Sequence, residues 1–320
     1  CHFDIDGNLW VTSSRSSSPL SMKSPDGTWK SYSCTSLLPT DRISNSVMDD
    51  NGTIWATVPR KGIWAYKTNL TPTDENDDEC QVLTTTVGNG ALPVANVNCV
   101  ALDLDGELWI GTEAGPAVIY SPSNVFGGGN YDAQQILIEQ DGNVQILLET
   151  ESITTIEIDG ANRKWIGTQN SGAFLISEDG TTQVLHFNEE NSPLPSNEIK
   201  DIEINGALGE VFFGTSKGVF SYRGSATAGG EFFSEVYAYP NPVRPEFDGT
   251  IAIKGLLRDS DVKITDVSGN LVFETTSYGG QALWNGRTFD DQKVSSGIYL
   301  VFASSEDGSL AVVTKIAIIN

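Results

Sequence analysis

VALDLDGELWIGT, residues 100–112, consists of an apolar strand, an Asp-Gly turn and a second apolar strand that carries a tryptophan. An Asp-Gly pair supplies the positive φ that a tight hairpin requires, so two antiparallel strands are expected here. In Leu108-Trp109-Ile110 the side chains of both strand faces are apolar. Such a strand is typical of a sheet that is stacked between two neighbouring sheets.

The same pattern occurs five times along the chain. The copies are FDIDGNLWVTS (3–13), SVMDDNGTIWATV (46–58), VALDLDGELWIGT (100–112), TIEIDGANRKWIGT (155–168) and IEINGALGEVFFGT (202–215). One aromatic residue per copy is predicted to anchor a blade: Trp10, Trp55, Trp109, Trp165 and Phe212. Their spacings of 45, 54, 56 and 47 residues are typical of four-stranded blades with loop insertions. The predicted fold class is all-β, with a β-propeller of five recognisable blades in residues 1–224.

Two further features of the repeats concern the propeller's construction. Gly111, Gly167 and Gly214 follow the anchor aromatic by two residues and are expected to allow close backbone approach. Propellers with this kind of repeat usually have more blades, and the sequence starts at Cys1 within a shortened inner strand. We therefore expect a piece of a longer chain whose other blades and export signal lie upstream. A five-bladed ring and a lipid-modified Cys1 are the alternatives.

Composition excludes several classes of function. The 320 residues carry a net charge of −23, which repels the phosphate backbone of nucleic acids. Two histidines and the lack of a Cys-x-x-Cys pair leave little for a metal site or a Ser-His-Asp triad. No apolar run approaches the roughly 18 residues of a transmembrane helix. We expect no catalytic residues, no metal, no cofactor and no transmembrane segment, and therefore a protein that is not an enzyme.

The few side chains that suggest a site also have structural interpretations. Asp4 and Asp103 begin Asp-x-Asp-Gly segments like the start of a calcium loop, but both segments lack the Glu at position twelve and are interpreted as hairpin turns. The acidic segment of residues 73–79 is expected to be a solvated loop, with an acidic contact loop or weak cation site as the alternative. His2 and His186 are isolated and predicted to lie on strands.

Tryptophans and cysteines leave alternatives open. Trp29 and Trp64 are predicted to lie on outer strands, either packed in the core or exposed as platforms for sugar rings. Spacing does not decide whether the cysteines form one or two disulfides or stay as buried thiols. The four are Cys1, Cys34, Cys80 and Cys99.

A second domain follows the repeats. Residues 224–230 (GSATAGG) are all small, and residues 225–231 form the expected linker. Residues 232–320 contain seven short alternating segments separated by turn signals, which predicts an Ig-like β-sandwich. The expected strands are residues 235–239, 250–253, 261–265, 271–275, 281–284, 297–304 and 310–319.

Both parts resemble known families. The WIGT segment at residues 165–168 and residues 213–222 resemble the two-component regulator propeller repeat of exported Bacteroidetes proteins. YPNPV (239–243), DVSGNLV (266–272) and SGIYLV (296–301), with the final Lys315-Ile316 strand, are similar to the C-terminal sorting domain of type IX secretion cargo. The matching sorting-motif residues are Pro240, Asn241, Pro242, Gly269, Gly297 and Tyr299.

A regulator-type propeller followed by a sorting-type sandwich resembles the surface components of the type IX attachment complex. That resemblance implies two propellers before the sandwich, and an exported protein at the outer-membrane surface or outside the cell after periplasmic transit. It also implies a non-enzymatic scaffold that docks the sortase, contacts other type IX outer-membrane components and presents anionic lipopolysaccharide for attachment to cargo. The alternatives are the extracytoplasmic sensor of a hybrid two-component system and a secreted cargo protein whose last domain is a sorting signal.

Charge is distributed unevenly between the two parts. From residue 225 on there are 12 acidic and 7 basic residues, a net of −5, which leaves −18 for residues 1–224. An acidic propeller favours basic protein partners. We therefore expect contact with an anionic glycan in the sandwich rather than on the propeller.

Overall fold

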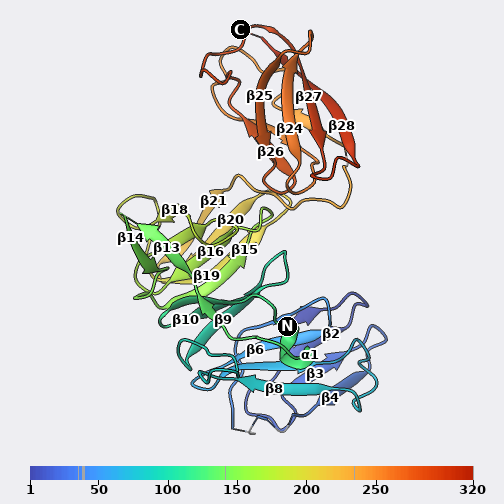
Figure 1. Cartoon of the computed structure of the whole chain (residues 1–320), viewed down its shortest axis with the longest axis vertical. Coiled ribbons are helices and arrows are strands. Elements are labelled where there is room, and N and C mark those ends of the chain that lie inside the picture. Colours follow the sequence, from blue (N-terminus) through green and yellow to red (C-terminus); the bar gives the residue numbers. More distant parts are fainter. Residues whose placement is uncertain (35, 38–39, 141, 234, 320) are drawn as a thin grey trace. The chain divides into compact units, whose positions relative to one another are not determined.

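The computed structural model is built almost wholly from antiparallel strands (Figure 1). It describes residues 1–34, 36–37, 40–140, 142–233 and 235–319. In this part of the chain one short helix occurs, α1 (Asn124–Gly127). The chain divides into two compact units: residues 1–158, 164–202 and 213–220, and residues 159–163, 203–212 and 221–320.

Five consecutive antiparallel sheets form the predicted blades. The first comprises β1 (His2–Phe3), β2 (Leu9–Thr12), β3 (Leu20–Lys23) and β4 (Trp29–Tyr32); the second β5 (Ser46–Met48), β6 (Thr53–Val58), β7 (Gly62–Lys67) and β8 (Glu79–Leu83). The third comprises β9 (Val97–Leu102), β10 (Leu108–Thr112), β11 (Gly115–Ile119) and β12 (Gln134–Gln135). The fourth comprises β15 (Ile153–Ile158), β16 (Lys164–Thr168), β17 (Ala173–Ile176) and β18 (Gln183–Phe187); the fifth β19 (Ile199–Asn205), β20 (Glu210–Thr215) and β21 (Gly218–Arg223). A separate hairpin, β13 (Leu137–Gln140) and β14 (Asn143–Ile146), follows β12. These sheets confirm the predicted β-propeller architecture.

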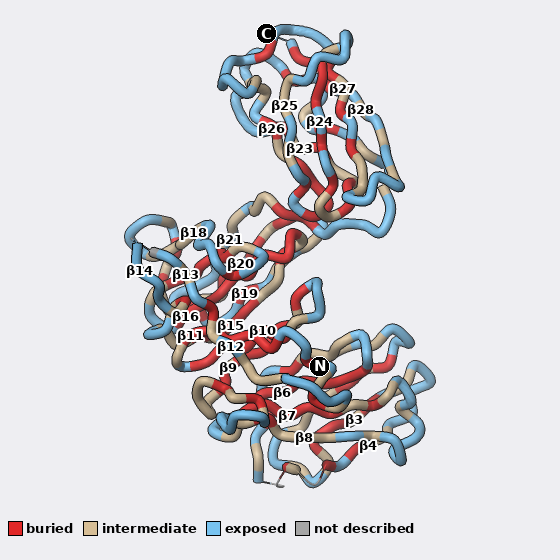
Figure 2. Tube along the Cα trace, in the orientation of Figure 1, coloured by how far each residue is buried: buried red, intermediate tan, exposed pale blue. Residues whose placement is uncertain are grey.

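Middle strands of the blades are buried on both faces. Every residue of β6 and β10 is buried, and Figure 2 shows such buried stretches along the central strands of the blades. Apolar clusters join each blade to the next: Trp10 packs with residues of blade two, Trp55 with blade three and Trp109 with blade four. Trp165 continues the series, since its ring lies 5.2 Å from that of Phe213 in blade five. The core is thus a row of interfaces between sheets.

The fifth anchor differs from the prediction. Phe212 is 37% exposed, whereas its neighbour Phe213 is fully buried. Each anchor tryptophan packs against the blade that follows it, and within the described residues the sheets after blade five belong to the sandwich and not to a sixth blade. Phe213 faces blade four and is buried, so the buried anchor of blade five is Phe213 rather than Phe212.

Glycines at the ends of the anchor strands permit close packing between blades. A Cβ added to Gly111 would lie 2.8 Å from Ile153 Cγ2, and one added to Gly167 would lie 2.7 Å from Ile199 Cγ2, in each case a residue of the next blade. Both distances are shorter than real Cβ contacts, so a side chain at either position would separate two sheets. The same addition at Gly214 meets nothing nearer than 3.6 Å.

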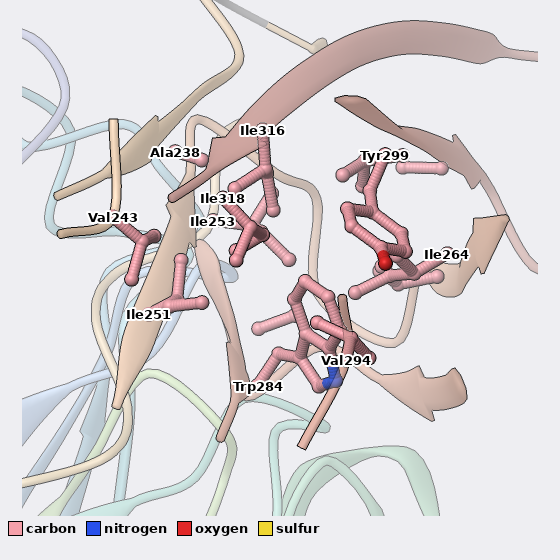
Figure 3. Close-up of a cluster of buried hydrophobic side chains, with 14 of the residues drawn as sticks. Ala238, Val243, Ile251, Ile253, Ile264, Trp284, Val294, Tyr299, Ile316 and Ile318 are labelled. Atoms are coloured by element: carbon pink, nitrogen blue, oxygen red, sulfur yellow. The ribbon is translucent and has the colours of Figure 1, made fainter. Parts of the chain in front are cut away.

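The C-terminal part of the second unit is a two-sheet β-sandwich. One sheet has the order β22 (Tyr237–Tyr239), β23 (Ile251–Lys254) and β26 (Gln281–Trp284). The other has the order β25 (Leu271–Thr276), β24 (Asp261–Asp266), β27 (Gly297–Ser304) and β28 (Ala311–Ile318). All seven strands overlap the predicted segments. Figure 3 shows Trp284, Tyr299 and Ile316 among the side chains that fill the space between the sheets.

The predicted linker, residues 225–231, lies in ordered contact with the rest of the second unit. Thr227 accepts a backbone hydrogen bond from Gly280 N at 2.9 Å, and Ala228 N donates to Gly206 O at 2.8 Å. A Cβ on Gly160 or Gly279 would lie 2.0 Å from Thr227 O. Backbone therefore packs directly on backbone here, which only glycine permits.

Candidate functional site

The Pro-Asn-Pro motif at the start of the sandwich attaches to its last strand. Pro240 and Pro242 have no N–H to give to a strand ladder, and both follow cis peptide bonds. The side chain of Asn241 takes the place of a backbone pair: Nδ2 donates to Lys315 O at 2.9 Å, and Oδ1 accepts from Ala317 N at 3.0 Å. The motif therefore holds β28 from the side opposite β27.

Backbone bonds extend this attachment by one residue. Val243 N donates to Ala317 O at 2.8 Å, and Ile319 N donates to Val243 O at 2.9 Å. Val243 and Ile318 form a parallel bridge, and both are buried. The end of the described chain is thus enclosed between β27 and the segment that follows β22.

Gly269 completes a turn that Asp266 organises. Asp266 Oδ1 accepts from Ser268 N at 2.8 Å and Asn270 N at 2.9 Å, and Oδ2 accepts from Asn270 Nδ2 at 2.8 Å. The Asn270 side chain and the turn amides lower the pKa of Asp266, because all of them donate to its charged form. Gly269 has φ of +86°, a left-handed conformation that favours glycine.

Gly297 and Tyr299 belong to β27 and have different positions. Gly297 is the exposed first residue of the strand. Tyr299 is buried, its ring lies 5.7 Å from that of Trp284, and its hydroxyl donates to Ser295 O at 2.9 Å. Burial raises the pKa of Tyr299. Asn241 and Tyr299 thus stabilise the sandwich itself, and Gly269 shapes one of its turns.

The outer face of the four-stranded sheet exposes an apolar stripe. Ile298, Phe302 and Val313 are 44%, 42% and 55% exposed, and Phe302 is directly paired with both Val313 and Lys263. Lys263 and Lys315 are exposed on the same face by the alternation of the strands. Apolar side chains bordered by lysines are suited to contact with a protein surface that is apolar and acidic. We call these five residues the sandwich stripe.

In the propeller, the Asp-x-Asp-Gly segments are hydrogen-bonded turns. Asp103 Oδ1 accepts from Asp105 N at 3.0 Å and Glu107 N at 2.9 Å, while Oδ2 accepts from Trp109 Nε1 at 3.1 Å. Asp4 makes the same set of bonds, including one from Trp10 Nε1 at 2.8 Å. The first aspartate therefore orients the anchor tryptophan. No group of His, Cys, Asp and Glu within the described residues is arranged to hold a metal ion.

A buried ion pair between blades three and four was not anticipated. Lys164 is fully buried and its Nζ lies 3.1 Å from Asp103 Oδ2. The ammonium also donates to Glu178 O at 2.6 Å and lies 4.8 Å from the centre of the Trp109 ring. A lysine at this position could have indicated a buried charge in the sequence, because the matching repeat position in blade three holds the apolar Leu108. Its partner could not be read from the sequence because it lies in another blade.

The remaining polar candidates have structural roles. Asp78 of the acidic segment accepts a hydrogen bond from the Tyr66 hydroxyl at 2.6 Å, and Glu75 pairs with Lys30 at 3.2 Å. The ring of His186 stacks on that of Phe174 in the neighbouring strand, with the ring centroids 4.0 Å apart. The acidic segment thus covers the edges of blades one and two.

Tryptophan and cysteine positions are now defined. Trp29 is 57% exposed, whereas Trp64 lies fully buried on β7, a middle strand, so the predicted position of Trp64 on an outer strand is wrong.

Cys34 and Cys80 form a disulfide that joins blade one to blade two across 46 residues of sequence. Cys99 is a buried thiol and burial raises its pKa to about 12, while Cys1 is exposed.

Comparison with known proteins agrees with both halves of the architecture. Residues 237–319 match the family model described as the secretion system C-terminal sorting domain. PorZ, a surface component of the type-IX secretion system of Porphyromonas gingivalis, is similar in structure with a TM-score of 0.67 and 29% sequence identity. The match covers 99% of this chain and 44% of PorZ, so the chain spans less than half the length of that protein.

More distant structures also match. The extracellular domain of a hybrid two-component system of B. thetaiotaomicron, BT4673, has 15% identity and a TM-score of 0.47, over 99% of this chain and 43% of its own. No curated protein sequence matches the chain significantly. Across the described residues, no helix has the length and apolar character needed to cross a membrane.

Proposed function

We propose that this chain is part of a non-enzymatic type IX secretion scaffold at the outer-membrane surface, which docks the sortase and presents anionic lipopolysaccharide for attachment to cargo. The observation that carries the proposal is the similarity to PorZ over 99% of the chain, through the propeller and the sorting-type sandwich together. PorZ is described as an essential surface component of that secretion system. A shared sandwich alone would suit any cargo protein.

Sandwich geometry supports a domain that stays in the working protein. The last described strand, β28, pairs with β27 along its whole length and is held on its other side by Asn241 and Val243. Ile316 and Ile318 on this strand belong to the buried core. A tightly packed domain of this kind can act as a stable docking module.

The sandwich stripe is the surface we assign to sortase docking. Its apolar side chains have no cover within the described part of the chain, and Lys263 and Lys315 border them. Exposed apolar patches with a charged rim are typical of protein interfaces. The propeller, with its net charge of −18, then offers a second surface for basic regions of other type IX components.

Site-specific photo-cross-linking on intact cells tests this assignment. A photoreactive residue is placed at Phe302 in the sandwich stripe and, as a matched control, at the similarly exposed Val184 on the propeller. We expect the sortase among the products from position 302 and a much lower yield from position 184. Cells in which position 302 gives no sortase product, while the protein is present at the surface, would contradict sortase docking by this face.

A further inference from the structure

The second unit contains a cavity of about 510 Å³ whose lining differs from the rest of the chain. The lining comes from the end of β21, from the segment around Tyr239 and from strands β23 and β26 of the sandwich. This volume lies within the range of roughly 300–1,000 Å³ typical of sites for small ligands. The cavity is therefore large enough for a ligand of one or two rings.

Charge inside the cavity is opposite to that of the protein. The chain holds 42 acidic residues against 19 Lys and Arg, yet the cavity lining contains Arg223 and Lys254 and no Asp or Glu. Among the described residues neither side chain forms an ion pair, and Arg223 Nη1 donates to the carbonyl of Leu208 at 3.2 Å. Two cations without acidic partners leave a local positive potential that favours an anion. Guanidinium and ammonium groups are the usual ligands of carboxylates and phosphates.

Aromatic side chains supply the rest of the surface. Tyr222, Tyr239 and Phe247 line the same cavity, and Tyr239 is 69% exposed. Ring faces beside cations suit a ligand that combines an acidic group with an apolar face. Sugar rings have such faces, formed by their C–H groups, and acidic sugars carry the charge on a carboxylate or phosphate attached to the ring.

The backbone that carries these side chains is held in place. Gln281 Nε2 donates to Ser225 O at 2.6 Å, and Gly224 N donates to Gly209 O at 2.7 Å. Arg163 Nη1 also donates to Ser225 Oγ at 3.0 Å. These bonds fix the chain immediately after Arg223 against strand β26, so less ordering is needed when a ligand binds.

We propose that this cavity binds an acidic saccharide, with Arg223 and Lys254 contacting its carboxylate or phosphate and the three aromatic rings contacting its sugar face. The proposal rests on the proposed function, since it locates the anionic glycan of that function in the second unit. An adjacent hollow of about 640 Å³ shares Lys254 and Leu208 but also contains Glu235, so the anionic group of the ligand is assigned to the first cavity and only uncharged parts of a longer glycan to the second.

Calorimetric titration of the whole chain tests the proposal with three probes: digalacturonate, glucose 1-phosphate and neutral cellobiose. We expect binding of one or both anions and at least about tenfold weaker binding of cellobiose. An R223Q/K254Q variant should lose at least about tenfold in affinity for the anion, because the loss of one charge-assisted bond already costs about that much. A K293Q variant removes one positive charge from an exposed position outside the cavity and should bind like the unchanged protein.

Three results would overturn the proposal. Neither anion binds, cellobiose binds as tightly as the anions, or the R223Q/K254Q variant binds the anion as tightly as the unchanged chain does. A short peptide with a free C-terminal carboxylate that binds in competition with digalacturonate, and more tightly, would replace the saccharide with a peptide ligand. Photo-cross-linking from position 302 in the R223Q/K254Q variant separates the two proposals, because sortase docking should persist when glycan binding is lost.

Discussion

Asp103 and Lys164 form one buried ion pair, but replacing them one at a time should have unequal consequences. Asp103→Ala leaves the fully buried Lys164 ammonium without its carboxylate, with the Glu178 carbonyl and the Trp109 ring as its remaining partners. Lys164→Leu leaves the Asp103 carboxylate with three hydrogen-bond donors, namely two turn amides and the Trp109 indole. Leucine is also the residue at the matching position of blade three, Leu108.

The expected magnitudes follow from these partners. Removing the partner of a buried charge typically costs about 3–5 kcal/mol, and we expect this for Asp103→Ala. Lys164→Leu should cost about 1–2 kcal/mol, since the carboxylate stays hydrogen-bonded and the leucine fills an apolar site. Asp49→Ala is the matched control, because Asp49 makes the same turn and indole bonds in blade two. Loss of those bonds alone should cost about 1–3 kcal/mol.

Urea denaturation followed by tryptophan fluorescence measures these differences, since six of the seven tryptophans precede residue 225. The order of destabilisation should be Asp103→Ala well above Asp49→Ala, with Lys164→Leu the mildest. If Asp103→Ala and Asp49→Ala lower the free energy of unfolding equally, the ion pair with Lys164 adds no stability beyond the hydrogen bonds of the turn, which would refute the expected difference. A Lys164→Leu variant as unstable as Asp103→Ala would refute it equally.

Three further predictions concern the sandwich, the blade interfaces and pH. Asn241→Ala removes two hydrogen bonds to β28 and should destabilise the sandwich by about 1–3 kcal/mol. Hydrogen exchange at the Ala317 amide should become faster. Unchanged exchange at this amide would show that Asn241 does not hold β28 in place. Gly167→Ala should lower the free energy of unfolding by about 1–3 kcal/mol, because the new methyl group forces two blades apart. Gly214→Ala should change stability little, since its Cβ meets nothing nearer than 3.6 Å. Equal effects of the two variants on the melting temperature would disprove close packing of the blades at Gly167. Burial lowers the pKa of His2 from 6.5 to about 4, so between these pH values the unfolded chain binds a proton that the folded chain does not. The free energy of unfolding should therefore fall as the pH drops from 6.5 to 4. Calorimetry of a His2→Gln variant should show a weaker fall, and a pH profile identical to that of the unchanged chain would exclude His2 as its cause.

Sequence predicts the elements of this protein well because their signals are local. An Asp-Gly or Asn-Gly pair marks each hairpin turn of the repeats, and alternating apolar residues on either side define the paired strands. Gly7, Gly52 and Gly106 have positive φ at these turns, whereas in blades four and five the positive φ falls on Asn162 and Gly209. The seven sandwich strands follow from the same two signals.

Features that depend on neighbouring sheets could not be predicted in the same way. Phe212 and Phe213 are adjacent and equally aromatic, and their exposure differs because a blade covers one face of the sheet and no described blade covers the other. The Asp103–Lys164 pair and the Cys34–Cys80 disulfide each join residues of different blades. Their pairing depends on how the blades are stacked, which no local pattern specifies.

The proposed scaffold requires that the sandwich remains part of the working protein at the cell surface and is not a removable sorting signal. Intact mass spectrometry of the native protein recovered from the surface of the cells that produce it tests this directly. We expect a mature chain that still contains the sandwich through the β28 segment, Ala311–Ile318. A surface protein whose chain ends near residue 230, with the sandwich removed, would rule out a retained docking domain and favour a secreted cargo protein.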